Sequence, residues 1–249
     1  SGVSVDEGLL IKFDLHALIT KQSSRQNAEE EREKILKQIS MTNGVLHSQY
    51  HLKSRTERIY TRNYNIQGLP KVSHGVILPD PGNRFIYFDI VANDLTMLFN
   101  MIGDQQGLKM LKASKDPYHE IATEAFGDGS QRERVKAFVS PYLYGAANKT
   151  IITNSRDKLV EQDIILLKTA MTSLFPESSD WLSRIKSSAE AGLIPRKFNP
   201  IDSIDIPIPK AIGTTVGPAM IIQRYGARLF RAIICALSRI GYDPKVFVH

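Results

Sequence analysis

The stretch from Arg132 to Gly145 constrains what this chain can fold into more than any other. Arg132, Lys136 and Tyr144 recur at multiples of four, which is a helical spacing. Each step of four residues overshoots one helical turn by about 40°, so the three side chains follow one slowly drifting stripe. Two cations at its start can bind phosphates, and a ring near its end can stack on a base. Taken alone, such a stripe is more often a solvated basic face that ends in a packed tyrosine.

The composition is that of an ordinary globular protein. Of 249 residues, 42% are hydrophobic and 23% are charged, which suffices for one large domain or two or three closely packed subdomains. Lys and Arg number 32 against 26 Asp and Glu, and the resulting net charge of +6 suits an anionic partner without requiring one. The single cysteine, Cys235, excludes an intrachain disulfide and a cysteine-based zinc site, and its apolar neighbours predict that it lies in a helical core.

The sequence shows neither a secretory signal nor an apolar run near the ~20 residues of a membrane span. We therefore expect an intracellular protein with no membrane partner.

Hydrophobic periodicity and capping signals predict an α+β protein with more helix than sheet. Asp116 as N-cap, Pro117 at the first helical position and Gly127 at the end delimit one helix. Aromatic and β-branched residues after a turn predict a strand over 84–90, and the prolines of 194–209 predict a short irregular hairpin. Helical spacing extends over residues 5–20, 27–40, 95–102, 131–143, 163–174, 177–191 and 215–240, and a last strand is expected over 245–249.

Asp89, at the end of the predicted strand, is the first candidate for chemistry. A buried carboxylate needs a hydrogen bond, a counter-ion or a metal, and Mg²⁺ takes one or two carboxylates together with phosphate oxygens. Asp89 could equally cap the following helix, and Asp94 could be an ordinary first-turn acid. Five of the six histidines form no metal-binding pattern, so we interpret them, and Glu120, as structural: His16, His47, His51, His74 and His119.

Eight short segments carry recognisable motifs. A single motif would be weak evidence for a family, but eight motifs in the same order along the chain are specific. They are Gly2–Asp6, Arg58–Arg62, Asn65–Pro70, Phe88–Leu95, Asp116–Gly127, Arg132–Gly145, Phe175–Trp181 and Phe247–His249. In this order they resemble, nearly end to end, the polymerase part of a family A DNA polymerase, the DNA polymerase I type. The resemblance implies a right-hand polymerase fold with an antiparallel palm sheet, helical fingers and a short helical thumb. It divides the chain into a reduced thumb (1–57), a first palm part with the catalytic strand (58–103), fingers (104–192) and a second palm part (193–249).

The same resemblance implies a DNA-directed DNA polymerase, a nucleotidyltransferase that serves DNA replication. It would add deoxynucleotides to a primer 3′ end by two-metal phosphoryl transfer, with two Mg²⁺ ions as cofactors and Mn²⁺ as a substitute. Its partners would be primer–template DNA, dNTPs and replication or processivity accessory proteins. We expect no proofreading domain, and a location in the cytoplasm or nucleoid of a bacterium or phage-infected cell, or in an organelle.

Family roles carry over only to the positions that match the family's motifs. Asp89 would hold the two metal ions, with the backbone carbonyl of Ile90 as a further ligand. Lys136 would act catalytically near the α-phosphate of the nucleotide, and Arg132 would bind the triphosphate toward its γ end.

The resemblance also implies roles around the base and the duplex. Tyr144 would lie beside the insertion site and the template base, where Gly145 allows close approach. Arg62 and Gln223 would touch the minor groove of the primer–template duplex, although the residues that flank Gln223 match the family less well.

The chain departs from the family at the nucleotide site. Ser140 stands where the family has Phe or Tyr, and Asp94 stands where it has Glu. In the family these two residues pack under the incoming sugar and block a 2′-hydroxyl. Both are smaller here, so we predict looser sugar discrimination. Pro141, which lacks an N–H, should kink the helix near its middle.

Two further departures concern the last residue of the sequence and the length of the predicted thumb. His249 stands directly before the position of the family's second metal-binding Asp. A chain that ended here should be inactive, but we expect the natural chain to continue to that Asp, because the strand before it is kept. The predicted thumb, residues 6–57, is short, and the Thr-Gly-Arg segment that the family has after the position of Arg62 is absent. We therefore predict low processivity without an accessory factor.

Two alternatives remain open. One is a catalytically inactive polymerase fold that binds nucleic acid, which the residue after His249 would distinguish from the enzyme. The other is a single-subunit RNA polymerase or primase-like relative, which shares the Arg132–Gly145 pattern and fits the reduced sugar gate. Against it, Arg58–Arg62 and Asn65–Pro70 resemble the DNA enzymes more.

Overall fold

The computed structural model of the chain describes residues 11–13, 37, 45–46, 48–52, 54–62, 67, 77–79, 81–84, 86, 89–113, 115–156, 158–200, 204–208 and 213–242. The chain divides into two compact units: Ser1–Phe88 with Phe230–His249 (unit 1) and Asp89–Leu229 (unit 2). The described elements are helices and small antiparallel sheets, which agrees with an α+β fold. The division into thumb, palm and fingers stays a prediction.

Unit 1 contains short antiparallel strands. β1 (Ile11–Phe13) lies between β2 (Val45–Leu46) and β5 (Ile77–Leu78) in a three-stranded sheet. β3 (Gln49–His51) and β4 (Tyr60–Arg62) pair as a separate hairpin.

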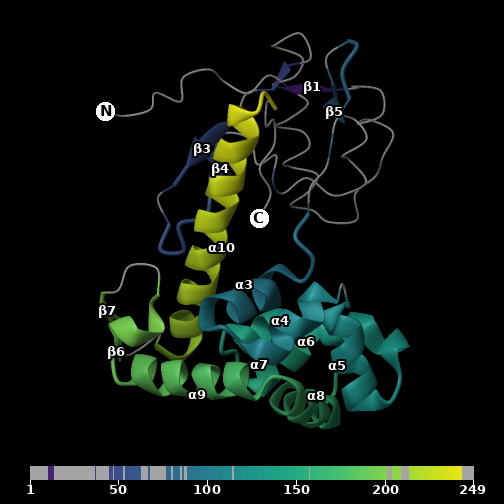
Figure 1. Cartoon of the computed structure of the whole chain (residues 1–249), viewed down its shortest axis with the longest axis vertical. Coiled ribbons are helices and arrows are strands. Elements are labelled where there is room, and N and C mark those ends of the chain that lie inside the picture. The colour runs from purple at the N-terminus through teal and green to yellow at the C-terminus, as the bar shows by residue number, and fades with distance from the viewer. Residues whose placement is uncertain are drawn as a thin grey trace. The chain divides into compact units, whose positions relative to one another are not determined.

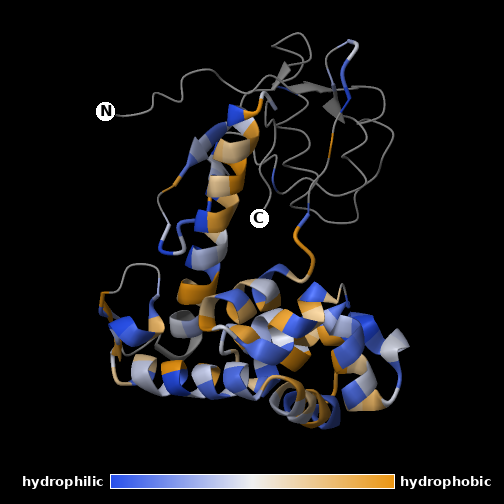
Figure 2. Cartoon of the chain, in the orientation of Figure 1, coloured by the Kyte–Doolittle hydropathy of each residue, from blue (hydrophilic) through white to orange (hydrophobic). Residues whose placement is uncertain are grey.

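Unit 2 is mainly helical (Figure 1). Its elements in chain order are α3 (Asn93–Ile102), α4 (Gln105–Lys112), α5 (Pro117–Phe126), the 3₁₀ turn η3 (Gly129–Gln131), α6 (Arg132–Leu143), α7 (Asn148–Asn154), α8 (Glu161–Leu174), α9 (Pro176–Glu190), β6 (Leu193–Ile194), η4 (Arg196–Phe198), β7 (Ile206–Pro207) and α10 (Gly213–Arg239), whose last turns belong to unit 1. Figure 2 shows hydrophilic and hydrophobic residues interleaved along these helices, as expected of helices that bury one face. None of the helices in the described ranges has the length and apolar character needed to cross a membrane.

Local capping signals predicted the helix ends well. Asp116 caps α5 by accepting a hydrogen bond of 2.9 Å from the Tyr118 amide, and Pro117 occupies the first turn. Gly127 ends α5 and Gly103 ends α3, with φ values of 69° and 74° that glycine adopts without a Cβ clash. The predicted helices over 95–102, 131–143, 163–174, 177–191 and 215–240 are confirmed within a few residues, and β6 and β7 pair antiparallel as the predicted hairpin.

The core of unit 2 lies among the packed faces of α3, α5, α6, α8 and α9. Phe99, Phe138 and Phe175 are fully buried, and the ring centroids of Phe99 and Phe175 are 4.6 Å apart. Burying a side chain of this size stabilises the fold by about 1.5–3 kcal/mol. This packing fixes the positions of the polar residues that α3, α5 and α6 carry.

A buried carboxylate joins the starts of two helices. Asp104 is fully buried and accepts a hydrogen bond of 2.9 Å from the Gly107 amide. It also accepts bonds of 3.1 and 2.6 Å from the amide and the hydroxyl of Ser178. Asp104 thus caps α4 and binds the first turn of α9, where the dipoles of both helices favour its negative charge.

Two secondary-structure predictions were wrong in the described residues. β1 lies inside the stretch 5–20, where the spacing predicted a helix, because pairing with two neighbouring strands overrides local periodicity. In the predicted strand 84–90, the described residues Arg84, Ile86, Asp89 and Ile90 belong to no strand. A strand needs a ladder partner, and this segment has none among the described residues. The predictions over 27–40 and 245–249 lie outside the described residues, except for Lys37, which is helical.

Two single-residue predictions also need correction. Cys235 is exposed on α10, like Ala232 and Ala236 beside it, because the last turns of the helix, residues 228–239, contain no buried residue. Pro141 lies in the last turn of α6 rather than near its middle, since the helix ends at Leu143. A proline so close to the end removes a backbone hydrogen bond only from the final turn.

Candidate active site

α6 directs its three cations to different surroundings. Arg132 is half-buried at the start of the helix, and Lys136, one turn later, is exposed without an ion pair or hydrogen bond to any described residue. Arg134 forms an ion pair with the buried Asp163 of α8 and lies 4.6 Å from the ring centroid of Phe126. Arg134 therefore fastens α6 to α8, which leaves Arg132 and Lys136 as the cations of the predicted stripe.

At the other end of the stripe, side chains of α6 and its C-cap contact Asp94, in the first turn of α3. Its side chain is buried, and Oδ2 accepts hydrogen bonds from the hydroxyls of Ser140 and Tyr144, both at 2.8 Å. The two donors lie one turn apart on the same face of α6. A buried carboxylate is costly unless it is hydrogen-bonded, and the two donors offset this cost. The contact brings together three of the predicted site residues, which are 46 and 50 positions apart in sequence.

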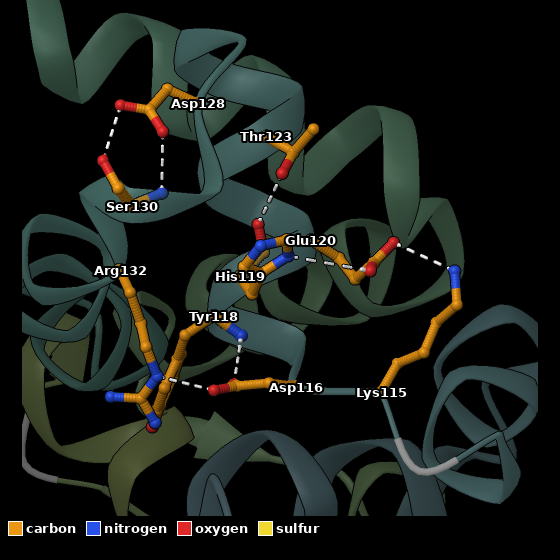
Figure 3. A network of polar contacts seen from close by, with 9 residues as sticks. All are labelled: Lys115, Asp116, Tyr118, His119, Glu120, Thr123, Asp128, Ser130 and Arg132. Atoms are coloured by element: carbon orange, nitrogen blue, oxygen red, sulfur yellow. Dashed lines mark hydrogen bonds and ion pairs between the residues drawn. The ribbon is translucent and has the colours of Figure 1, made fainter.

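Arg132 is held by residues of α5 (Figure 3). Its Nε lies 2.5 Å from Oδ2 of Asp116, and its guanidinium carbon lies 5.3 Å from the ring centroid of Tyr118. Burial pushes the pKa of Asp116 upward, but the hydrogen bonds from Arg132 and from the Tyr118 amide outweigh it, so this pKa lies below the ordinary 3.8. The bond with Asp116 raises the pKa of Arg132. Both groups are therefore charged near neutral pH.

Several charges of the site affect the pKa of Tyr118. Burial raises the pKa of its phenol to about 12, and the negative charge of Asp94 adds to this rise. Arg132 opposes the rise, while Asp116 and Asp89 contribute to it to a lesser extent. The phenol is therefore neutral near pH 7, and the predicted site residues Asp89 and Asp94 lie within electrostatic range of the ring that Arg132 covers.

Asp89 is exposed just before α3, and Ile90 beside it is half-buried. Between Asp89 and Asp94, Ala92 has φ 46°, a left-handed conformation that costs a non-glycine residue roughly 1–2 kcal/mol. The Asp89 carboxylate and the Ile90 carbonyl are hard oxygen donors of the kind that Mg²⁺ prefers. The described ranges contain no cluster of three His, Cys, Asp or Glu side chains, so these two donors would need ligands from substrate or water to complete a magnesium shell.

The remaining predicted site residues are distributed over both units. Arg62 is exposed on β4 of unit 1, and Gln223 is half-buried on α10 in unit 2. Gly145 follows α6 and is buried with φ 78°, so the backbone at this position requires a glycine. The geometry within unit 2 thus joins Asp94, Ser140 and Tyr144 directly, whereas the roles of Arg62 and Gln223 stay predictions.

Asp116 and Tyr118 are residues of this site that the sequence pattern does not reveal. Asp116 has the pattern of a helix cap, and Tyr118 that of a packed aromatic residue. Their contacts with Arg132 arise because α5 and α6 pack against each other. Asp116 and Arg132 are 16 positions apart, a separation that brings no two residues together in any single helix or strand. Only the tertiary arrangement could identify them.

Comparisons with known proteins identify the fold. No protein-family model matches this sequence, and no curated protein matches it. Among solved structures, the chain is similar to the polymerase domain of Pol1 from M. smegmatis, solved in complex with DNA primer-template and dNTP, with a TM-score of 0.68 and 14% identity. The match covers 90% of this chain and 43% of that chain, so this chain spans less than half the length of the structure it matches. At this identity the likeness shows the fold alone, which is polymerase-like.

Proposed function

We propose that this chain carries the nucleotide-adding part of a template-directed DNA polymerase of the DNA polymerase I type. Its substrates would be primer–template DNA and dNTPs. The observation that carries the proposal is the composition of α6. Besides Arg134, which pairs with Asp163, it has Arg132 and Lys136 in its first half and two hydroxyls bonded to Asp94 at its end. This helix lies in a fold similar to that of a DNA polymerase domain.

In this proposal the cations of α6 bind the triphosphate. Lys136 is exposed and has no partner among the described residues, so its ammonium group can bind a phosphate without first breaking an ion pair. Arg132 presents a planar fork of N–H donors, the geometry that matches phosphate oxygens. Lys136 would lie near the α-phosphate, where bonds form and break, and Arg132 nearer the γ-phosphate.

Asp89 and the Ile90 carbonyl would hold Mg²⁺ or Mn²⁺ together with substrate oxygens. Metal ions bound there would lower the pKa of the primer 3′-hydroxyl and neutralise charge on the leaving pyrophosphate. The exposure of Asp89 supports this role, because a carboxylate in contact with solvent can accept an ion that arrives with the nucleotide.

The small side chains under the predicted sugar position favour a second candidate function, a polymerase that also accepts ribonucleotides. Ser140 offers a hydroxyl where the family has an aromatic ring, and that hydroxyl is held on Asp94. Neither residue supplies the bulk that excludes a 2′-hydroxyl. A primase-like relative would use the same feature.

Primer extension with Mg²⁺ tests the proposal. The parent protein is expected to extend a labelled primer on a template, and Asp89→Asn to lose at least about 100-fold in rate while duplex binding is retained. Asp128→Asn, an exposed aspartate at the start of η3, serves as the matched control and should extend normally. Duplex binding by a parent that extends no primer would instead favour the inactive nucleic-acid-binding fold.

A further inference from the structure

We infer that Asp116 and Tyr118 are positioning residues of the triphosphate site, which hold the Arg132 guanidinium so that part of its donor fork stays available to a phosphate. This inference rests on the proposed function, because it takes Arg132 to be a ligand of the triphosphate. It adds the N-cap and one first-turn residue of α5 to the phosphate-binding cations that the sequence predicts on α6.

The carboxylate of Asp116 uses only one edge of the guanidinium. Oδ2 lies 2.5 Å from Nε of Arg132, a short charge-assisted hydrogen bond. On the other side, NH1 lies 3.3 Å from Oε1 of the exposed Glu133, a contact that solvent screens. The NH2 nitrogen has no hydrogen-bond partner within the described part of the chain. A planar guanidinium held in this way can still donate to a phosphate oxygen.

The ring of Tyr118 restricts the guanidinium from a second direction (Figure 3). The guanidinium carbon lies 5.3 Å from the ring centroid, within the range of a cation–π contact. Tyr118 itself is buried, so the ring is fixed by packing. One edge of the Arg132 guanidinium contacts the carboxylate of Asp116, and one face lies over the ring of Tyr118. Arg132 therefore has little side-chain freedom left to lose when a ligand binds.

Asp116 is in turn fixed by the helix that it caps. Its Oδ1 accepts the hydrogen bond from the Tyr118 amide at 2.9 Å, while Oδ2 accepts the bond from Arg132. The two oxygens of one carboxylate thus have two tasks, and the cap determines the direction of the oxygen that binds Arg132. Such prior ordering strengthens binding because less conformational entropy is lost when the ligand binds.

A competing role for Asp116 makes the opposite prediction. If the carboxylate occupied Arg132 at the expense of the triphosphate, removing its charge would tighten nucleotide binding. If it positions Arg132, removing its charge loosens binding. The sign of the change in affinity therefore separates the two roles.

The test is the dissociation constant of dGTP with Mg²⁺, measured by equilibrium titration without turnover. Asn caps helices about as well as Asp, so Asp116→Asn keeps the cap and removes the charge. We expect Asp116→Asn to bind dGTP about tenfold more weakly than the parent, the scale of one lost charge-assisted hydrogen bond. Asp128→Asn, whose parent carboxylate contacts Ser130 and Gln131 but not Arg132, is the matched control and should leave the affinity unchanged.

A double-mutant cycle distinguishes positioning from a general effect on folding. In an Arg132→Gln background, Asp116→Asn should cause no further loss, because its only route to the ligand is gone. Tyr118→Phe keeps the ring and should retain the affinity, whereas Tyr118→Leu should weaken it by several-fold.

The outcomes separate this inference from the proposed function. Unchanged or tighter dGTP binding by Asp116→Asn, or a loss that persists in the Arg132→Gln background, overturns the positioning role and leaves the proposed function intact. Failure of the parent and every variant to bind dGTP overturns both.

Discussion

The hydroxyl of Tyr144 donates a hydrogen bond of 2.8 Å to Oδ2 of Asp94, and this bond ties the end of α6 to the first turn of α3. Ser140 donates to the same oxygen at the same distance. At the two positions proposed to lie under the incoming sugar, the side chains are therefore the small Asp94 and Ser140, which are fixed by hydrogen bonds, and position 140 carries no aromatic ring. Its selectivity should respond to changes in the size of the side chain at position 140.

Sugar selectivity is the first prediction. Ser140→Phe should raise the ratio of kcat/KM for dGTP over GTP by about tenfold or more, because a ring there removes the space for a 2′-hydroxyl. Ser140→Ala, which changes the size of the side chain little, should leave the ratio nearly unchanged. Single-nucleotide incorporation measures both ratios. Strong rejection of ribonucleotides by the parent protein would contradict the reduced gate.

The second prediction concerns stability. Tyr144→Phe should lower the free energy of unfolding by about 1–2 kcal/mol, because the buried carboxylate of Asp94 loses one of its two hydroxyl donors. Tyr242→Phe removes the hydroxyl of an exposed tyrosine and should have no measurable effect. Urea unfolding followed by circular dichroism compares the two, and equal stability of both variants would show that the Asp94 bond contributes nothing.

Two glycines of unit 2 give a third, paired prediction. A Cβ on Gly107 would lie 2.3 Å from the buried ring of Phe99, so Gly107→Ala should destabilise the protein by about 1–3 kcal/mol through overpacking. A Cβ on Gly129 would lie 2.1 Å from the ring of His119, but this side chain is exposed and can rotate away. Gly129→Ala should therefore be nearly neutral. Thermal unfolding measures the melting temperatures of both variants. A lower melting temperature for Gly129→Ala than for Gly107→Ala would refute the packing argument.

The pH dependence of stability is the fourth prediction. The folded-state pKa of Asp116 lies below 3.8, so its charged form stabilises the folded state. That contribution is fully present above the unfolded-state pKa and is lost as the pH falls through the folded-state pKa. The difference in unfolding free energy between the parent and Asp116→Asn should therefore be constant from pH 7 to about 5 and shrink below about 4. A difference that grew toward acid pH would have the wrong sign for this ion pair.

The sequence predicted those parts of the molecule that depend on local chemistry. Asp116, Pro117 and Gly127 delimit α5 because caps and breakers act within one turn. The shared face of Ser140 and Tyr144 follows from helical spacing alone.

Features that depend on tertiary contacts could not be predicted in this way. The resemblance singled out Asp94, Ser140 and Tyr144, but not the hydrogen bonds that join them, because α3 and α6 meet only in the folded chain. Likewise, the second role of Asp116 depends on the packing of α5 against α6. The aromatic composition of 84–90 favours an extended chain, but whether it becomes a strand depends on a partner. The apolar neighbours of Cys235 do not show that the last turns of α10 contain no buried residue.

The most direct test of the central claim is templated single-nucleotide addition. The parent should add only the dNTP that is complementary to the template base, for each of the four bases. Lys136→Ala should lower kcat/KM by about 100-fold, and Lys149→Ala, which removes an exposed lysine of α7, should not. Addition that ignores the template, no addition at all, or equal activity of the two lysine variants would contradict the account.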